Sequence, residues 1–383
     1  MTFPLVATTL YGLEEVLARE LSEIGASDIV MLNRAVKYRG DLAVLYKSNL
    51  YLRTALKVLK PIAEFKARNE QELYDGVKQI KWDEFISPHH TIAVDGTTYS
   101  DTFKHSKYVA LKTKDAIVDQ FREKFNVRPS VDVDNPDLQV NMHIAEILCT
   151  VSLDSSGSHL GKRGYRQEQV LAPISETMAA GIILLSEWDK KSDFLDPMCG
   201  SGTFPIEAAM IATNTAPGNL RHFAFEKWKD FDPALWKSIK EESEKRVIPF
   251  TGKISGRDSD EMAVRISRNN AARAGVNSIV KFEINDFFKN EAQTENCLIV
   301  MNPPYGERLN EEDEMIPFYK EIGTKLKHFY MGCDAWIISG NTDAIKFVGL
   351  KPSRKLRLFN GPIECKLHKF QMYRGSKRGG NEI

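Results

Sequence analysis

The sequence predicts an α/β protein whose larger, carboxyl-terminal part is built on a mostly parallel sheet. Two observations support this. Short apolar strands alternate with amphipathic helices from residue 166 onward, a pattern typical of parallel sheets covered by helices. Polar side chains follow several of these strands directly, at Asp196, Asp258, Asp286 and Asn302. Open parallel sheets bind ligands where their strands end, so these four side chains are expected around one site.

Composition limits the possible functions. The 383 residues suit two or three domains, and 42% of them are hydrophobic, enough for sizeable cores. Lys plus Arg and Asp plus Glu both number 52, so any nucleic-acid partner must be argued from local patches. The five cysteines are scattered, and we expect neither a metal site nor a disulfide framework. The sequence shows no signal peptide and no run of about 18 apolar residues, so we expect a cytoplasmic protein with no membrane partner.

The first module, residues 1–65, is predicted as strand, helix, strand, strand, helix and strand. The first helix follows from the apolar spacing between Leu13 and Ile24, and Gly25 ends it. Asp41 is a plausible N-cap of the second helix. This order is ferredoxin-like, and by itself it says nothing about function.

The second module, residues 66–165, is predicted to contain two helices and several strands. The longer helix ends near Phe125, and its basic face is interrupted by acids, so a solvated face and an RNA-binding face both remain open. A loop with three cations, one aromatic ring and two glycines closes the module. Arg and Lys can reach phosphates and Tyr can stack on a base. The candidate RNA-binding residues in and beside this loop are Lys162, Arg163, Tyr165 and Arg166.

The third module, residues 166–383, is organised around a strand, a glycine turn and a helix from Thr203 to Ala212. Gly200 and Gly202 allow a sharp turn, the amides at the helix start favour an anion, and Asp196 adds a carboxylate. A ligand with both negative and positive groups fits this loop, as S-adenosylmethionine does. A dinucleotide would require a third glycine, which is missing here. An ordinary joint between strand and helix is the alternative. The candidate cofactor residues of this loop are Asp196, Met198, Cys199, Gly200, Ser201, Gly202 and Thr203.

A second motif follows the apolar strand 298–301. Pro303 and Pro304 fix the loop. Asn302 carries an acceptor and donors, and with the Pro303 carbonyl it can accept both hydrogens of an exocyclic amino group. Tyr305 offers a stacking face. This motif, about a hundred residues after the glycine loop, resembles the class I methyltransferases that methylate amino nitrogens. Asn302, Pro303, Pro304 and Tyr305 are therefore the candidate catalytic residues, and Asn302 is also a candidate cofactor contact.

Taken as a whole, the chain resembles the THUMP-domain RNA methyltransferases, most closely the bacterial guanine-N2 methylases of large-subunit ribosomal RNA. The resemblance spans nearly all of the sequence. It implies a ferredoxin-like module, a THUMP RNA-binding module and a Rossmann-like class I methyltransferase domain, with S-adenosylmethionine as cofactor and ribosomal RNA as partner. Some relatives carry a second methylase domain, and the end of this chain at Ile383 leads us to expect one modification per enzyme.

The resemblance also assigns Asp258 to the ribose hydroxyls of the cofactor. Its alternative role is the N-cap of the helix 260–274, which Ser259 or Asp260 could provide instead. Ser259 is kept as a cofactor candidate. Asp286 can accept the adenine amino group, and Phe287 can flank the ring.

Several expectations stay open. The aromatic-rich insertion at 214–250 is expected to pack over the site, or less favourably to gate it. Segment 351–378 carries nine cations against Glu364 alone, which favours phosphate binding over a merely solubilising tail. Cys199 as a covalent nucleophile is disfavoured, because it lies in the cofactor loop and not beside a base. The alternative functions are a methylase of adenine N6 or of a protein glutamine, and a non-catalytic RNA-binding protein. The oligomeric state and the target nucleotide stay open.

Overall fold

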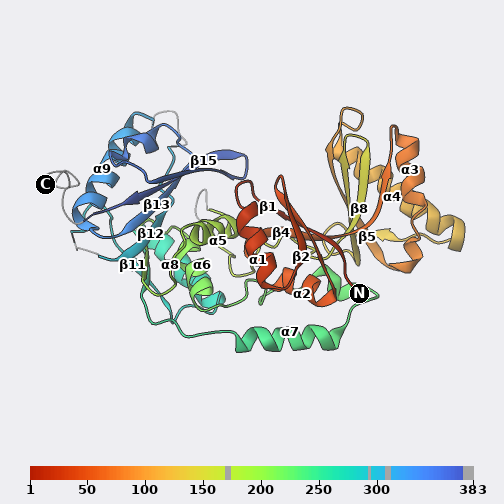
Figure 1. Cartoon of the computed structure of the whole chain (residues 1–383), viewed down its shortest axis with the longest axis horizontal. Coiled ribbons are helices and arrows are strands. Elements are labelled where there is room, and N and C mark those ends of the chain that lie inside the picture. The colour runs from red at the N-terminus through yellow and green to blue at the C-terminus, as the bar shows by residue number, and fades with distance from the viewer. Residues whose placement is uncertain (169–173, 292–294, 307–311, 374–383) are drawn as a thin grey trace. The chain divides into compact units, whose positions relative to one another are not determined.

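The structure is a computed structural model that describes residues 1–168, 174–291, 295–306 and 312–373 (Figure 1). The chain forms two compact units. The first unit comprises residues 1–9, 17–160 and 221–242, and the second comprises residues 10–16, 161–220 and 243–383. The units are therefore not successive pieces of the sequence, because the chain leaves and re-enters each of them.

The first unit begins with the predicted ferredoxin-like order. The elements of this order are β1 (Phe3–Thr9), α1 (Glu14–Glu23), β2 (Ser27–Leu32), β3 (Ala35–Gly40), α2 (Leu42–Tyr51) and β4 (Ala55–Lys66), with the first turn of α1 counted in the second unit. Asp41 is the N-cap of α2, as predicted, since its side chain accepts a hydrogen bond from the Val44 amide at 3.0 Å.

The second module continues the same sheet. Its elements are α3 (Glu70–Lys78), the 3-10 turn η1 (Trp82–Glu84), β5 (Thr91–Tyr99), α4 (Ser106–Phe125), β6 (Ser130–Val131), β7 (Leu138–Ala145) and β8 (Leu148–Asp154). β4 is long enough to pair with both β1 and β8, which gives one eight-stranded sheet in the order β2-β3-β1-β4-β8-β7-β5-β6. β5 runs further than the predicted strand 92–94, and β6 is shorter than the predicted strand 131–133.

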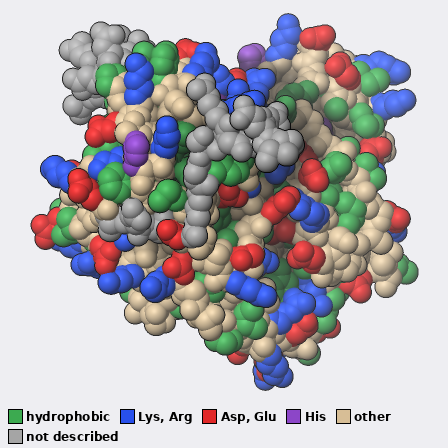
Figure 2. Space-filling view, turned by 60° about the vertical axis from the view of Figure 1, so that its left-hand side comes forward, with side chains coloured by type: hydrophobic (Ala, Val, Ile, Leu, Met, Phe, Trp, Pro, Cys, Tyr) green, Lys and Arg blue, Asp and Glu red, His purple; other side chains and the backbone are tan. Residues whose placement is uncertain are grey.

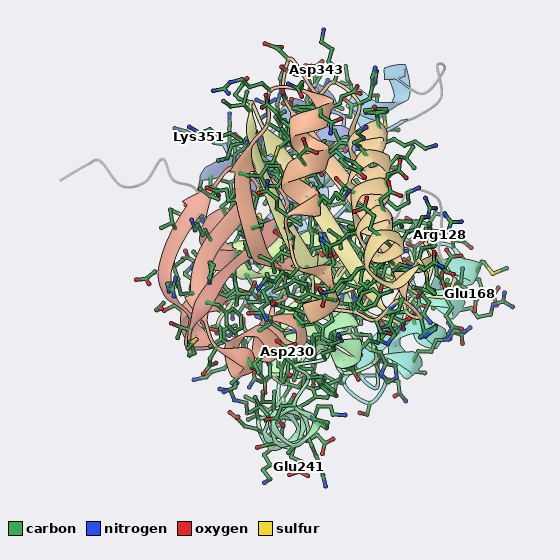
Figure 3. The ribbon with its side chains drawn as sticks, turned by 90° about the vertical axis from the view of Figure 1, so that its right-hand side faces the viewer. Arg128, Glu168, Asp230, Glu241, Asp343 and Lys351 are labelled. Atoms are coloured by element: carbon green, nitrogen blue, oxygen red, sulfur yellow. The ribbon has the colours of Figure 1, made fainter. Side chains whose placement is uncertain are left out.

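The insertion between the strands of the third module returns to the first unit. It contains η2 (Ala224–Lys227) and α7 (Pro233–Lys245). Phe225 stacks on Tyr46 of α2 with ring centroids 4.4 Å apart, and Trp236 meets the same ring edge-on. The Lys60 ammonium pairs with Asp230 at 2.9 Å; Figure 3 labels Asp230 on this segment. The rings of residues 221–242 therefore belong to the core of the first unit, and the expectation that the insertion packs over the cofactor site stays a prediction.

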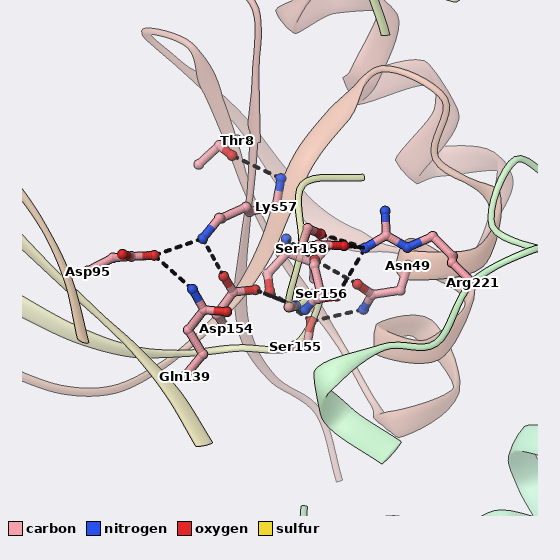
Figure 4. Close-up of polar contacts among 12 residues, drawn as sticks. Thr8, Asn49, Lys57, Asp95, Gln139, Asp154, Ser155, Ser156, Ser158 and Arg221 are labelled. Carbon is pink, nitrogen blue, oxygen red and sulfur yellow. Dashed lines mark hydrogen bonds and ion pairs between the residues drawn. The ribbon is translucent and has the colours of Figure 1, made fainter. Parts of the chain in front are cut away.

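A polar network ties the insertion to the first unit (Figure 4). The Arg221 guanidinium donates to the backbone carbonyls of Ser156 and Ser158. Asn49 of α2 donates to Ser155 Oγ at 2.8 Å and accepts from Ser156 Oγ at 2.7 Å. In the same region the Lys57 ammonium pairs with the buried Asp154 at 2.8 Å. Each buried polar group thus meets a partner from another segment, which fixes how the segments pack.

The second unit holds the predicted parallel sheet. Its strands are β9 (Asp193–Asp196), β10 (Ile254–Asp258), β11 (Val280–Ile284), β12 (Cys297–Met301), β13 (Asp334–Ser339), β14 (Arg354–Asn360) and β15 (Ile363–Gln371). They lie in the order β11-β10-β9-β12-β13-β15-β14. The first five are parallel, and β15 is antiparallel to both neighbours, so the predicted closing antiparallel pair is confirmed. The order reverses at β9 and β12, which makes their carboxyl ends the expected binding crevice.

Helices cover both faces of this sheet. They are α5 (Glu176–Leu185), α6 (Thr203–Ala212), α8 (Glu261–Arg273) and α9 (Glu312–Phe329), with the 3-10 turn η3 (Ala344–Val348). Alternate strand residues enter two cores: Leu298 and Val300 face the α5 and α6 side, whereas Ile299 faces the α9 side. Strands buried on both faces read as continuous apolar runs, which is why the sequence 297–301 shows no alternation.

Within the described residues, no helix has the length and apolar character needed to cross a membrane. The same part of the chain shows no group of three metal-ligating side chains. All five cysteines are free thiols. Acidic and basic side chains are intermixed on the face shown in Figure 2, in agreement with the zero net charge.

Candidate active site

The loop between β9 and α6 is tied down by its own amides. Cys199 N–H donates to the Arg257 carbonyl at 2.8 Å, and Gly200 N–H donates to Asp258 Oδ2 at 2.8 Å. Gly202 has a φ of +83°, and a Cβ there would come within 2.8 Å of Ser267, so only glycine fits. The buried Asn270 of α8 donates to the Ser201 carbonyl at 3.0 Å, a support that sequence reasoning missed because helix position alone does not reveal it.

These contacts restrict where an anion can bind. The amides of Met198, Cys199, Gly200 and Gly202 already donate to protein acceptors. The predicted anion-binding role is therefore left to the amide of Ser201 and to those of the buried Thr203 and Phe204 at the first turn of α6, where Pro205 has no N–H.

Asp196 ends β9 and is almost completely buried. Burial raises its pKa well above the usual range, and the nearby Asp258 carboxylate raises it further, although the Met198 amide opposes this. Two carboxylates so close to each other favour a positively charged ligand. The pair therefore fits a ligand with an amine or a sulfonium.

Asp258, the last residue of β10, has the place predicted for it. Its Oδ2 accepts from Gly200 and its Oδ1 accepts from the Asp260 amide at 3.0 Å. The N-cap of α8 is Asp260, whose side chain accepts from the Met262 amide at 2.8 Å. Asp258 therefore does not cap the helix, and each of its oxygens keeps a second lone pair for a ligand. Ser259 lies exposed between the two acids.

Asp286 and Phe287 follow β11, and their side chains have different environments. Asp286 is half-buried and accepts from the Phe288 amide at 3.0 Å. Burial opposes its ionisation, but Lys289 at 3.2 Å lowers its pKa overall. Phe287 lies in the α9-side core, where its ring stacks on Tyr330 with centroids 5.8 Å apart. The expectation that Phe287 flanks the adenine is therefore wrong, because its ring is used inside the core.

Asn285 was not predicted and has an unusual environment. Its side-chain Oδ1 is buried and has no hydrogen-bond partner among the residues described here. A buried acceptor without a partner is costly, and a ligand donor that reaches this oxygen would satisfy it.

The predicted catalytic loop begins directly after β12. Pro303 is buried, Pro304 is exposed, and Asn302 and Tyr305 are half-buried. The Tyr305 hydroxyl donates to Asn302 Oδ1 at 2.5 Å. The ring of Tyr305 lies against Gly340, where a Cβ would meet it at 2.8 Å. The hydroxyl thus orients the acceptor atom on which the predicted chemistry depends.

Two residues that the sequence analysis did not select hold this loop: Asn341, which lies just after β13, and Tyr319 of α9. Asn341 Nδ2 donates to the Tyr305 carbonyl at 3.1 Å. The Tyr319 hydroxyl lies 3.5 Å from the Pro304 carbonyl and 2.5 Å from Ser339 Oγ. Both residues lie far from the motif in sequence, so no local pattern could reveal them.

The loop predicted to bind RNA is largely internal. Arg163 and Tyr165 are buried, Arg166 is half-buried, and only Lys162 of the four is exposed. Arg163 Nε lies 3.5 Å from Glu207 Oε1, and the Tyr165 hydroxyl donates to the same oxygen at 3.1 Å. The prediction that Arg163 and Tyr165 contact RNA is therefore wrong, because both side chains are buried within the second unit, whereas the RNA contact of the half-buried Arg166 stays a prediction.

The basic carboxyl-terminal segment is exposed only in part. Lys351, Arg354, Lys355 and Arg357 are exposed, whereas Lys366 and Lys369 are half-buried. Lys366 donates to the Thr342 carbonyl and Lys369 pairs with Asp334 at 2.7 Å. Arg374, Lys377 and Arg378 lie outside the described residues.

Cys199 does not suit a nucleophile. Burial raises its pKa well above the usual range, and Asp196 and Asp258 raise it further. Since the thiolate is the nucleophilic form, the alternative of covalent catalysis loses support.

Taken together, the polar groups around the ends of β9, β10 and β11 fit S-adenosylmethionine. The adjacent carboxylates of Asp196 and Asp258 suit its positive groups and ribose hydroxyls, and Asp286 with the unpaired Asn285 Oδ1 suits its adenine amino group. The amides at the first turn of α6 suit its carboxylate. Asn302 lies on the other side of the switch point, at the end of β12.

Comparison with known families agrees with this reading. Residues 163–369 match the methyltransferase domain of the RMKL-like family. Residues 67–154 match the THUMP domain, and residues 4–59 match the RlmL ferredoxin-like domain.

Two curated relatives cover almost the whole chain. The protein slr0064 of Synechocystis, named as a candidate RNA methyltransferase, is 36% identical over 374 residues, which are 97% of each chain. The ribosomal RNA large subunit methyltransferase K/L of Syntrophotalea carbinolica is 38% identical over 378 residues. This chain spans only 53% of that second relative.

Solved structures agree with the fold. SMU.472, a candidate methyltransferase solved with SAH, is 34% identical with a TM-score of 0.88 and covers 98% of this chain and 99% of its own. A Listeria monocytogenes protein described as a predicted N6-adenine-specific DNA methylase is 30% identical, with a TM-score of 0.86 and 97% of each chain covered. TrmN from Thermus thermophilus, at 16% identity and a TM-score of 0.71, shares the fold over 97% of this chain and 100% of its own.

Proposed function

This chain belongs to the family of RMKL-like methyltransferases, and on that premise we propose that it methylates the exocyclic N2 amino group of a guanine in large-subunit ribosomal RNA. S-adenosylmethionine is the methyl donor. The observation that carries the proposal is the position of Asn302. It directly follows β12, across the switch point from Asp196, and the Tyr305 hydroxyl already orients its Oδ1.

The chemistry follows from the groups available. The cofactor supplies an activated methyl group as a sulfonium, so the protein needs no nucleophile of its own. The exocyclic amine is a weak nucleophile because its lone pair is delocalised into the ring. Asn302 Oδ1 and the Pro303 carbonyl accept its two hydrogens and turn the lone pair toward the methyl group. With S-adenosylmethionine bound, the new nitrogen–carbon bond would form as its carbon–sulfur bond breaks, and the amine would then lose a proton to water. Alignment alone can lower the barrier by several kcal/mol.

RNA as the substrate is supported by the first unit. The THUMP match at residues 67–154 and the RNA methyltransferase names of two relatives favour an RNA over a DNA or a protein. In this proposal the eight-stranded unit selects the RNA, and the target base leaves its stack to reach Asn302.

A second candidate is methylation of another planar amine or amide, such as adenine N6 or a protein glutamine. The name of the Listeria relative favours this alternative, and the loop from Asn302 to Tyr305 would hold such groups equally well. A non-catalytic RNA-binding role is disfavoured, because the acids around the cofactor loop are all in place.

The deciding experiment uses purified protein with methyl-labelled S-adenosylmethionine. Naked large-subunit ribosomal RNA, precursor particles, double-stranded DNA and a glutamine peptide are offered separately, and the products are identified by mass spectrometry. N2-methylguanine in the ribosomal RNA supports the proposal, whereas N6-methyladenine or methylglutamine would replace it by the second candidate. Asn302→Ala is the control: it should bind the cofactor normally and transfer almost no label.

A further inference from the structure

The loop from Lys162 to Arg166 was expected to bind phosphates, and its contacts point to another task. Arg166 touches the amino ends of two helices at once. One guanidinium nitrogen, Nη2, donates to Thr203 Oγ1 at 2.7 Å and to the Ile174 carbonyl at 2.8 Å. Nε lies 3.3 Å from Glu176 Oε1. Thr203 is the first residue of α6, Glu176 is the first residue of α5, and Ile174 lies just ahead of α5.

The rest of the loop is anchored one turn further along α6. Residues four apart share one face of a helix, so Thr203 and Glu207 point the same way. Arg163 and Tyr165 both meet Glu207 Oε1, and the exposed fractions of the Arg163 and Glu207 side chains are 1% and 0%. Removing one partner of such a buried ion pair strongly destabilises the folded protein, because the other charge is left buried without a partner. The loop therefore runs along a single face of α6 and is held at two successive turns.

We propose that Arg166 is a positioning residue for S-adenosylmethionine, which fixes the first turn of α6 beside the start of α5 so that this turn can bind the cofactor's carboxylate. Two observations support this task. The amides of Met198, Cys199, Gly200 and Gly202 already donate inside the protein, so the first turn of α6 and the adjacent Ser201 amide are where an anion can be received. The guanidinium also donates directly to the first residue of α6 and thereby fixes a helix amino end that favours anions, while Glu176 offsets part of its charge.

The planar shape of the guanidinium explains why arginine, and not lysine, suits this positioning role. Its planar Nη2 donates to a hydroxyl and a carbonyl in fixed directions while Nε lies beside a carboxylate, whereas a lysine ammonium is a single flexible point charge. Arg166→Lys should therefore keep the charge and lose part of the geometry. Arg166→Gln should lose both.

The test measures binding, not turnover. SAH and 5′-methylthioadenosine, which lacks both the carboxylate and the amino group of the amino-acid chain, are titrated by calorimetry into the wild type, Arg166→Gln, Arg166→Lys and Lys162→Gln. Loss of a hydrogen-bonded charge should weaken SAH binding roughly tenfold in Arg166→Gln, with an intermediate loss in Arg166→Lys. Methylthioadenosine affinity should stay within about twofold. Lys162→Gln, at the exposed position of the same loop, should match the wild type for both ligands.

Three outcomes would overturn the proposal. SAH affinity could remain at the wild-type level in Arg166→Gln. Both ligands could weaken equally, which would mean that the substitution damages the fold as a whole. Large-subunit RNA affinity, followed by anisotropy across a salt series, could fall while SAH affinity holds, which would return Arg166 to the RNA-binding role. If Arg166→Gln does not fold, Arg166→Lys alone decides, since it must lose SAH affinity without losing methylthioadenosine affinity.

Discussion

The Gly200 amide donates a hydrogen bond to Asp258 Oδ2 at 2.8 Å, and this bond joins the loop after β9 to the end of β10. Asp258 thus shapes the cofactor loop from the neighbouring strand, in addition to any contact with the ligand.

The first prediction follows from this pair. Asp258→Asn should weaken S-adenosylmethionine binding by roughly tenfold or more, because hydrogen bonds to a charged group contribute about 1.5–3 kcal/mol. Calorimetric titration is the measurement. The control is Asp260→Asn, two residues away: it keeps an acceptable N-cap and should leave the cofactor affinity unchanged. Equal affinity in the wild type and Asp258→Asn would remove Asp258 from the cofactor site.

The second prediction concerns the hydroxyl that orients Asn302. Tyr305→Phe keeps the ring against Gly340 and removes the donor to Asn302 Oδ1. The lost hydrogen bond contributes about 1 kcal/mol. If this raises the activation barrier by the same amount, turnover should fall roughly fivefold while cofactor affinity stays constant. Single-turnover methylation measures the effect. A fully active Tyr305→Phe enzyme would show that the hydroxyl has no part in aligning Asn302.

The third prediction concerns pH. The pKa of Asp196 is raised in the folded protein, chiefly by burial and then by Asp258. Above the unfolded value near 3.8, the folded state therefore holds more protons at this site than the unfolded state. Stability must then fall as the pH rises from about 4 toward the higher folded pKa. A cationic ligand favours the ionised form, so cofactor affinity should rise over the same pH range.

Asp196→Asn isolates this contribution. The free energy of unfolding of the ligand-free protein, measured by denaturant titration at several pH values, should fall less steeply with pH in the variant. Comparison of the two proteins is needed because other buried acids, such as Glu20 and Glu176, also have a raised pKa. Parallel curves for the two proteins would contradict the assignment.

The fourth prediction concerns the returning segment. Trp236 is 5% exposed and its ring meets Tyr46, Phe223 and Phe225. Trp236→Ala should destabilise the first unit by about 3–5 kcal/mol, the usual cost of a large cavity. Cofactor affinity should not change, because these contacts all lie in the first unit. Lys237→Ala, whose side chain is exposed and pairs with Glu241 only at 3.9 Å, should change stability by less than about 1 kcal/mol. Denaturant unfolding of both variants provides the comparison.

The sequence by itself determined the local pieces. The glycine turn after Asp196, the N-cap at Asp41 and the polar residues at the strand ends were all predictable, because short-range backbone geometry dictates them. The parallel sheet followed from the alternation of strands and helices, and its carboxyl edge then assembled the site.

Only the tertiary structure decided which side chains are accessible. Arg163 lies 44 residues from Glu207, and Asp232 lies 186 residues from Tyr46. The local sequence therefore does not distinguish a cationic side chain that binds RNA from one that pairs with a buried carboxylate. The same holds for Phe287, whose ring is used by the α9-side core. Burial and ion pairing arise from contacts between distant segments. The free-energy cost of burying a charged or aromatic side chain depends on those contacts more than on its neighbours in sequence.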